Sequence, residues 1–285
     1  MRNLLLCTSA LCAAAIAAPA MAQNVPAGAA GDEPSVYDGD WLSIGAGAGY
    51  GPSYDGSDDY VVFPVPVVQG NLAGIGITPR MGGIALDFVP DPDKGVGFNI
   101  GPAIRLRTNR ASQIEDKVVR SLGKLDRAVE VGPSLGIKVS QVFHEYDALS
   151  INADVAWDVA GAHKGMVVTP SVTYFTPLNR GVAVGLNVSA EYGDRKFADY
   201  YYSVSPVQSA ASGLSAFSAG KGFTKIGVAA IGGIDLDGDL LNGGFAVVLG
   251  GGYARMLGDA KDSPFTSERG SPNQWFGAVG LGYTF

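Results

Sequence analysis

The segment LSINADVAWDV, residues 149–159, alternates apolar side chains with small or polar ones over its whole length. Successive side chains of a β-strand point to opposite faces, so this pattern indicates a strand with one apolar and one polar face. The same alternation recurs at residues 96–107, 129–140 and 182–191. These segments exceed the usual ~5–6 residues of a strand in a globular sheet, and they have the length that a tilted strand needs to cross a bilayer.

Extended over the whole chain, the pattern predicts an all-β fold, a single antiparallel transmembrane β-barrel of about 12 strands. Connectors of two to seven residues alternate with longer ones at 109–126, 193–222 and 256–272. We therefore expect short periplasmic turns and longer extracellular loops. The expected strands are 41–50, 59–69, 72–79, 83–89, 96–108, 127–140, 147–159, 166–176, 181–192, 223–235, 243–255 and 273–285.

The composition excludes several other classes of protein. Apolar residues make up 47% of the 285 residues and charged residues only 16%, which is too apolar for a disordered chain. The formal net charge of −7 argues against a partner that is a nucleic acid. Glycine is abundant, with 41 residues, but it keeps no period of three, so a collagen-like chain is also excluded.

The N-terminal segment has the features of a secretory signal peptide. Arg2 supplies the positive charge, residues 4–18 are apolar, and Ala20-Met21-Ala22 forms a small-x-small cleavage site. We expect three parts: a cleaved signal peptide at 1–22, a flexible periplasmic arm at 23–40 and the barrel at 41–285. Both cysteines lie in the first part, so the mature chain would contain no thiol for catalysis or metal binding.

The C-terminal end resembles the assembly signal of outer-membrane barrels. Val279, Leu281, Tyr283 and Phe285 share one face of the last expected strand, and the chain ends on the aromatic residue. With the signal peptide, this pattern predicts transport through the inner membrane and insertion into the outer membrane of a Gram-negative cell. The expected partners are outer-membrane lipid, lipopolysaccharide and the barrel-assembly machinery.

Three loop sequences resemble those of the MipA/OmpV family of outer-membrane proteins, a family of proteins similar to MltA-interacting protein. They are YGPSYDGSDDY at 50–60, YYSVS at 201–205 followed by AASGL at 210–214, and LGDA, DSP and ERGS within 257–271. The resemblance implies an outer-membrane barrel without established catalytic residues. One family member is known as a scaffold for a lytic transglycosylase and a murein synthase, and others are porin-like or adhesion-related.

Charged residues on the polar faces of the expected strands should line the lumen. Two interpretations remain open, a pore lined by charges and a lumen closed by salt bridges. Mixed signs in a narrow interior favour pairing, so we expect Arg105 or Arg107 to face an acid on a neighbouring strand, with the 193–222 loop folded inward. The expected lumen charges are Arg105, Arg107, Glu130, Lys138, Asp154, Asp158 and Glu191.

Some residues resemble known catalytic or ligand-binding motifs, but the surrounding sequence favours other roles for them. GPSLG at 132–136 matches the G-x-S-x-G nucleophile motif, but it lies within an alternating strand instead of a strand-to-helix turn. DLDGD at 235–239 fits a polar turn better than a calcium loop. Aromatic residues at 197 and 200–202 could form a ligand-stacking surface, although an interfacial girdle is favoured.

The sequence thus predicts no enzyme, no cofactor and no metal. The expected function is that of a structural or scaffold barrel linked to murein (peptidoglycan) enzymes, which rests on the family resemblance. The alternative is a passive porin-like channel for small solutes or a surface-binding, adhesion-type barrel that uses the three long loops.

Overall fold

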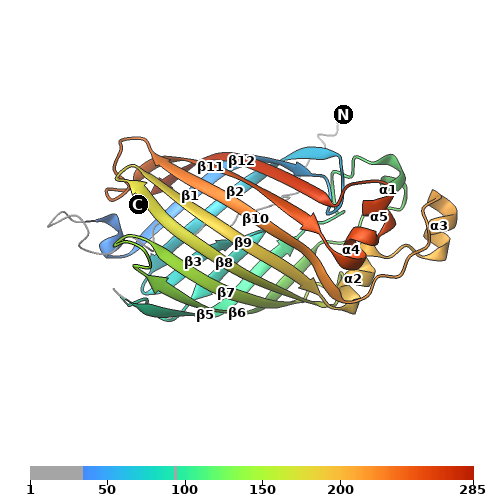
Figure 1. Cartoon of the computed structure of the whole chain (residues 1–285), viewed down its shortest axis with the longest axis horizontal. Helices are drawn as coiled ribbons and strands as arrows, with labels where there is room; N and C mark the ends of the chain where they lie inside the picture. Colours follow the sequence, from blue (N-terminus) through green and yellow to red (C-terminus); the bar gives the residue numbers. More distant parts are fainter. Residues whose placement is uncertain (1–34, 93–94) are drawn as a thin grey trace, which may run out of the picture.

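Twelve strands form one closed barrel in the computed structural model, which describes residues 35–92 and 95–285 (Figure 1). Each strand is antiparallel to its neighbours, and β12 closes the barrel against β1. The prediction of a single antiparallel twelve-stranded barrel is therefore confirmed. The strands are β1 Trp41–Pro52, β2 Tyr60–Leu72, β3 Ile75–Arg80, β4 Gly83–Asp87, β5 Val96–Arg107, β6 Ala128–Ser140, β7 Ala148–Asp158, β8 Met166–Asn179, β9 Val182–Gly193, β10 Gly222–Asp235, β11 Gly244–Met256 and β12 Asn273–Thr284.

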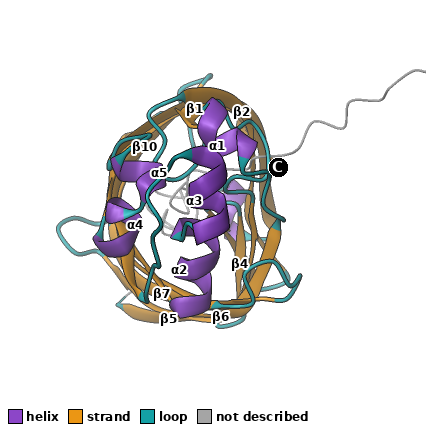
Figure 2. Cartoon of the chain, turned by 90° about the vertical axis from the view of Figure 1, so that its right-hand side faces the viewer, coloured by secondary structure: helices purple, strands orange, loops and turns teal. Residues whose placement is uncertain are grey.

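The two ends of the barrel differ, as the alternating connector lengths predict. One end carries short turns and both ends of the described chain, and because short turns face the periplasm in outer-membrane barrels we call it the periplasmic end. At the extracellular end, the long loops fold into short helices that lie across the mouth of the barrel (Figure 2). These helices are α1 Lys117–Ser121, α2 Arg195–Tyr202, α3 Pro206–Ser212, α4 Gly258–Asp262 and α5 Pro264–Ser267.

The chain preceding β1 is attached to the periplasmic end. Residues Val36–Asp38 form a 3-10 turn in which the Tyr37 N–H donates to the Ser35 hydroxyl at 3.2 Å. The Val36 N–H donates to the Leu241 carbonyl at 2.8 Å, which ties this turn to the β10–β11 connection. The predicted signal peptide and residues 23–34 of the predicted arm lie outside the described residues.

The outer wall of the barrel is apolar. Large aliphatic and aromatic side chains are exposed on the outward positions of nearly every strand, including Ile44, Phe98, Leu135, Leu186 and Val228. In water such a continuous surface would be unfavourable, whereas a bilayer solvates it. No helix of the described residues is long and apolar enough to cross a membrane.

Candidate functional site in the barrel lumen

A buried glutamate organises the extracellular half of the lumen. Glu130 on β6 is fully buried and accepts hydrogen bonds from Nε of Arg105 at 2.6 Å and Nε of Arg107 at 2.7 Å. A third contact comes from Nε2 of His163 at 3.1 Å. Because Nδ1 of His163 accepts from the Gly165 N–H at 3.0 Å, the ring hydrogen lies on Nε2 and is donated to Glu130.

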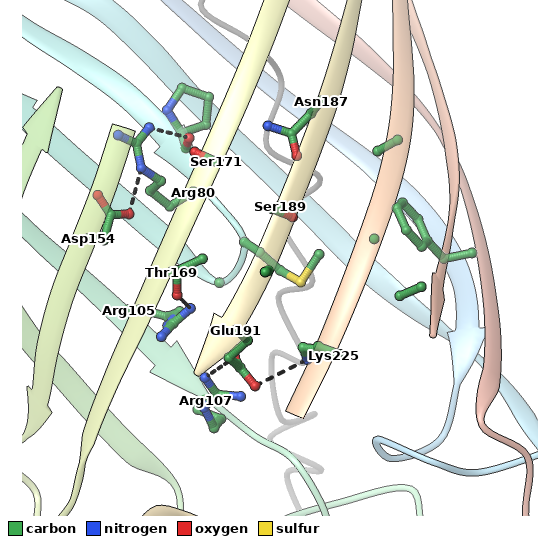
Figure 3. Close-up of a pocket in the computed structure, with 18 of the residues that line it drawn as sticks. Arg80, Arg105, Arg107, Asp154, Thr169, Ser171, Asn187, Ser189, Glu191 and Lys225 are labelled. Carbon is green, nitrogen blue, oxygen red and sulfur yellow. Dashed lines mark hydrogen bonds and ion pairs between the residues drawn. The ribbon is translucent and has the colours of Figure 1, made fainter. Parts of the chain in front are cut away.

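The network continues across the lumen to a second acid. Arg107 donates through Nη2 to Glu191 on β9 at 2.6 Å, so one guanidinium joins β5, β6 and β9. Lys225 on β10 lies 3.8 Å from Glu191 and 3.2 Å from both carboxylate oxygens of Asp55, which belongs to the β1–β2 loop. Figure 3 shows Glu191 between Arg107 and Lys225. A chain of alternating charges thus crosses the barrel.

A second group of polar contacts lies between β3, β6 and β7. Arg80 on β3 donates through Nε to Asp154 at 2.8 Å (Figure 3). It also donates through Nη2 to Ser134 at 3.3 Å. Ser134 in turn donates to Asp154 at 2.6 Å. The G-x-S-x-G serine is therefore part of a structural polar contact in mid-strand, and within residues 35–92 and 95–285 no histidine is its hydrogen-bond partner.

The remaining two expected lumen charges lie near the ends of their strands and contact neighbouring turns. Lys138 pairs with Asp91 of the β4–β5 turn at 2.7 Å, near the periplasmic end. Asp158, the last residue of β7, accepts from the N–H groups of Ala160, Gly161 and Lys164 and so shapes the β7–β8 loop. Backbone donors thus occupy this carboxylate.

Between these groups lies a cavity of about 350 Å3. Its polar lining includes Asn99, Asn152, Asn187 and Arg80, and its apolar lining includes Phe63. A volume of this size lies at the lower end of the range for small-molecule pockets. The lumen is therefore crossed by paired charges but retains room for a small ligand.

An aromatic helix lies over the extracellular end of the lumen. Phe197, Tyr201 and Tyr202 of α2 are buried together with Val167 and Met256 of the barrel wall. The Arg107 guanidinium lies 4.7 Å from the centroid of the Phe197 ring, so the helix packs directly on the charge network. The prediction of an interfacial girdle for these aromatics is wrong, because they turn inward on a helix, whereas the expected inward fold of this loop is observed.

A second apolar cluster joins the other loops to this helix. Tyr54 of the β1–β2 loop, Val119 of α1, Leu214 and Phe265 of α5 pack together, and the Arg110 guanidinium lies 3.9 Å from the Phe265 ring centroid. We call α1–α5 and these two apolar clusters the cap. Burial raises the pKa of three cap tyrosines, Tyr54, Tyr201 and Tyr202, above that of a free phenol.

One ion pair links the loops of the cap to each other. Arg269 in the β11–β12 loop donates to Asp116, the N-cap residue of α1, at 2.6 Å. Burial alone would raise the pKa of Asp116, but Arg269 and the N–H groups of Val118 and Val119 hold it below its ordinary value. This carboxylate therefore fixes α1 to the last loop at neutral pH.

Sequence reasoning missed four members of the lumen network, Asp55, Arg80, His163 and Lys225. Arg80 directly follows the expected strand 72–79 and lies two residues after Thr78, which faces the lumen. Its side chain would therefore point to the same side, and this was the available signal. Asp55 and His163 belong to loops, where parity gives no information. In residues 35–92 and 95–285, no three His, Cys, Asp or Glu side chains are grouped so that they could hold a metal ion.

These features define a transmembrane β-barrel with an ion-paired lumen and a helical extracellular cap. The family model of the MltA-interacting protein MipA matches residues 44–285, so the chain belongs to the MipA family. No curated protein matches the sequence significantly.

Several solved structures are similar in their overall course. An outer membrane channel from Pseudomonas putida F1 is 12% identical, with 90% of this chain and 99% of that chain covered and a TM-score of 0.42. A FadL homologue from Pseudomonas aeruginosa is 8% identical, covers 94% and 96% respectively, and has a TM-score of 0.33. At these identities and TM-scores, neither structure indicates what this chain binds or transports.

Proposed function

We propose that the chain is a non-enzymatic scaffold barrel of the outer membrane that holds a lytic transglycosylase at its periplasmic end, and through it a murein synthase. The family name supports the first partner, since it denotes an MltA-interacting protein. The observation that favours a structural role over an open pore is the charge network around Glu130 beneath the cap, which joins opposite walls of the lumen. Signal peptide cleavage after Ala22 and the assembly role of Val279, Leu281, Tyr283 and Phe285 belong to the same proposal.

The periplasmic turns would provide the contact surface. Phe143 of the β6–β7 turn is 80% exposed, which makes it a large apolar side chain available at this end. Aromatic side chains of this kind supply much of the binding energy at protein interfaces. Val207 on α3, at the extracellular end, is 79% exposed and provides a control of equal exposure.

The test is a binding titration of the purified full-length barrel against a purified lytic transglycosylase from the same cell. We expect Phe143→Ala to lower the affinity by about 2 kcal/mol, roughly 30-fold, if this side chain is a central contact. Val207→Ala should bind as the unchanged protein does. Absence of binding by the unchanged barrel would contradict the scaffold proposal itself.

A second candidate is a passive channel or binding barrel for small solutes. The cavity of about 350 Å3 favours it, because a purely structural lumen needs no such space. Conductance measurements distinguish this candidate from a closed scaffold.

A further inference from the structure

One seam of the barrel is paired over only a small part of its length. β2 has 13 residues, but its contacts with β3 in the sheet are limited to Gly70↔Ile77, Asn71↔Gly76 and Leu72↔Ile75. On its other side, β2 pairs with β1 from Tyr60 to Asn71. The edge of β2 from Tyr60 to Gln69, roughly 30 Å of strand, thus has no sheet partner on the β3 side among the described residues.

The reason is the length of the next hairpin. β3 and β4 have only six and five residues and turn back at Met81 and Gly82. β4 then follows β5 closely, since the Leu106 N–H donates to the Gly82 carbonyl and the Phe88 N–H donates to the Ile100 carbonyl. The hairpin therefore stays with β5 and diverges from β2 toward the extracellular end. We call the edges Tyr60–Gln69 and Thr78–Gly82 the open seam.

The sequence of β2 suits an edge without a partner. The Ser53 N–H donates to the Asp59 carbonyl, which sets the odd-numbered residues of β2 as the hydrogen-bonded partners of β1. The even-numbered residues 60–68 consequently direct their backbone groups into the seam. Two of these five positions are Pro64 and Pro66, which have no N–H, so fewer unpaired donors face the membrane.

The prolines also argue against a simple alternative, in which another strand pairs with this edge. A ladder along β2 would lack two of its donors, at Pro64 and Pro66. At its upper end the edge is bridged by a loop, because Nε2 of Gln113 donates to the Val62 carbonyl at 3.2 Å. The seam is therefore bounded by β2, by the β3–β4 hairpin and above by the β5–β6 loop.

The lumen cavity reaches both edges of the open seam. Val61 and Phe63 line it from β2, and Thr78, Pro79 and Arg80 line it from β3. On the outside, the rim carries exposed apolar side chains, Val62 on β2 and Met81 at the turn of the hairpin. An apolar entrance thus leads from the bilayer toward polar side chains inside.

We propose that the open seam is a lateral portal through which small amphipathic molecules pass between the membrane and the lumen cavity. The apolar end of such a molecule would contact the rim, and its hydrogen-bonding end would reach asparagine and arginine side chains such as Asn99 and Arg80. A water-soluble ion gains nothing from an apolar rim. The portal does not depend on the scaffold function, and it can be tested without the partner enzyme.

The test places a single reporter thiol in the cavity. Asn187, which lines the cavity on β9, is changed to Cys in the chain that begins at Gln23 and contains no other cysteine. The full barrel is reconstituted in phosphatidylcholine vesicles. Its reaction rate is measured with N-(1-pyrenyl)maleimide, which dissolves in the bilayer, and with a sulfonated maleimide, which remains in water.

Two substitutions narrow the rim from opposite sides, Met81→Trp on the hairpin and Val62→Trp on β2. Leu186→Trp is the control, because Leu186 is exposed on the outer face of β9, on a different part of the wall. Using either rim variant that folds, we expect pyrenyl labelling to slow by about tenfold or more, corresponding to ~1.4 kcal/mol in the barrier. The control should change it less than twofold.

Equal pyrenyl rates in rim and control variants would overturn the portal. A sulfonated reagent that reacts as fast as the pyrenyl reagent would also overturn it, because the route would then be aqueous and axial. Failure of transglycosylase binding leaves both rates unchanged, so the two proposals fail separately.

Discussion

Replacing Glu130 with glutamine should destabilise the barrel more than any substitution of an exposed acid. The side chain is fully buried and accepts from two guanidinium groups and from His163. Glutamine preserves the size, but it removes the negative charge that offsets Arg105 and Arg107. Removing one partner of a buried ion pair costs about 3–5 kcal/mol.

For a chain of this size, each kcal/mol corresponds to a shift of about 2–4 °C in the unfolding temperature. The expected decrease for Glu130→Gln is therefore roughly 6–20 °C. Thermal unfolding of the detergent-solubilised barrel, followed by the loss of β-sheet circular dichroism, measures this change. Because barrel unfolding is often irreversible, wild type and variant must be heated at the same rate.

Glu115→Gln is the matched control. Glu115 is 51% exposed and lies 3.6 Å from Arg120, so its loss should cost less than about 1 kcal/mol. If Glu130→Gln unfolds within the same narrow range as Glu115→Gln, the charge network does not hold the barrel together, and the reasoning is wrong.

Three further predictions concern the cap and the assembly of the barrel. Gly193→Ala should lower stability by about 1–3 kcal/mol in denaturant unfolding, because its Cβ would clash with the Phe197 ring, whereas Gly222→Ala on the facing strand meets nothing within 4 Å and should be neutral. The cap should loosen as the pH rises above about 10, because the pKa values of its three buried tyrosines are raised in the folded protein. The stability that these neutral phenols contribute is complete below the pKa of a free phenol and is lost as they ionise. Limited proteolysis at increasing pH measures the loosening of the cap, and unchanged protection at pH 12 would contradict the prediction. Deleting Phe285 should reduce the amount of folded barrel in the outer membrane, while secretion into the periplasm continues. Cell fractionation measures both amounts, and normal insertion of the shortened chain would exclude the assembly role.

The strands could be predicted because the alternation and the length of each strand are visible within its own segment of sequence. In segment 149–159, period and length were visible within eleven residues, and the structure has β7 at Ala148–Asp158. Parity placed Arg105, Arg107, Glu130 and Glu191 on the polar face, and these residues line the cavity, whereas Asp158 shapes a loop instead. Parity could not indicate that Arg107 would reach Glu191, because that contact depends on how far each strand is shifted against the next around the barrel.

The cap and the open seam were harder to predict. The aromatics at 197 and 200–202 lie on a helix of eight residues, which is too short for a periodic signal, and their burial depends on contacts with distant strands. For the seam a signal did exist. Pro64 and Pro66 within an expected strand indicate an edge, but the prediction of a closed barrel gave no reason to look for one.

We propose that the charge network and the cap together close the barrel axis. Conductance of the purified full-length barrel in a planar lipid bilayer tests this claim most directly. We predict no steady conductance from the unchanged protein and measurable openings after Arg105 and Arg107 are both replaced by alanine, because the lumen then loses the side chains that join its walls. A steady, ohmic current through the unchanged barrel would contradict the account and identify an open pore.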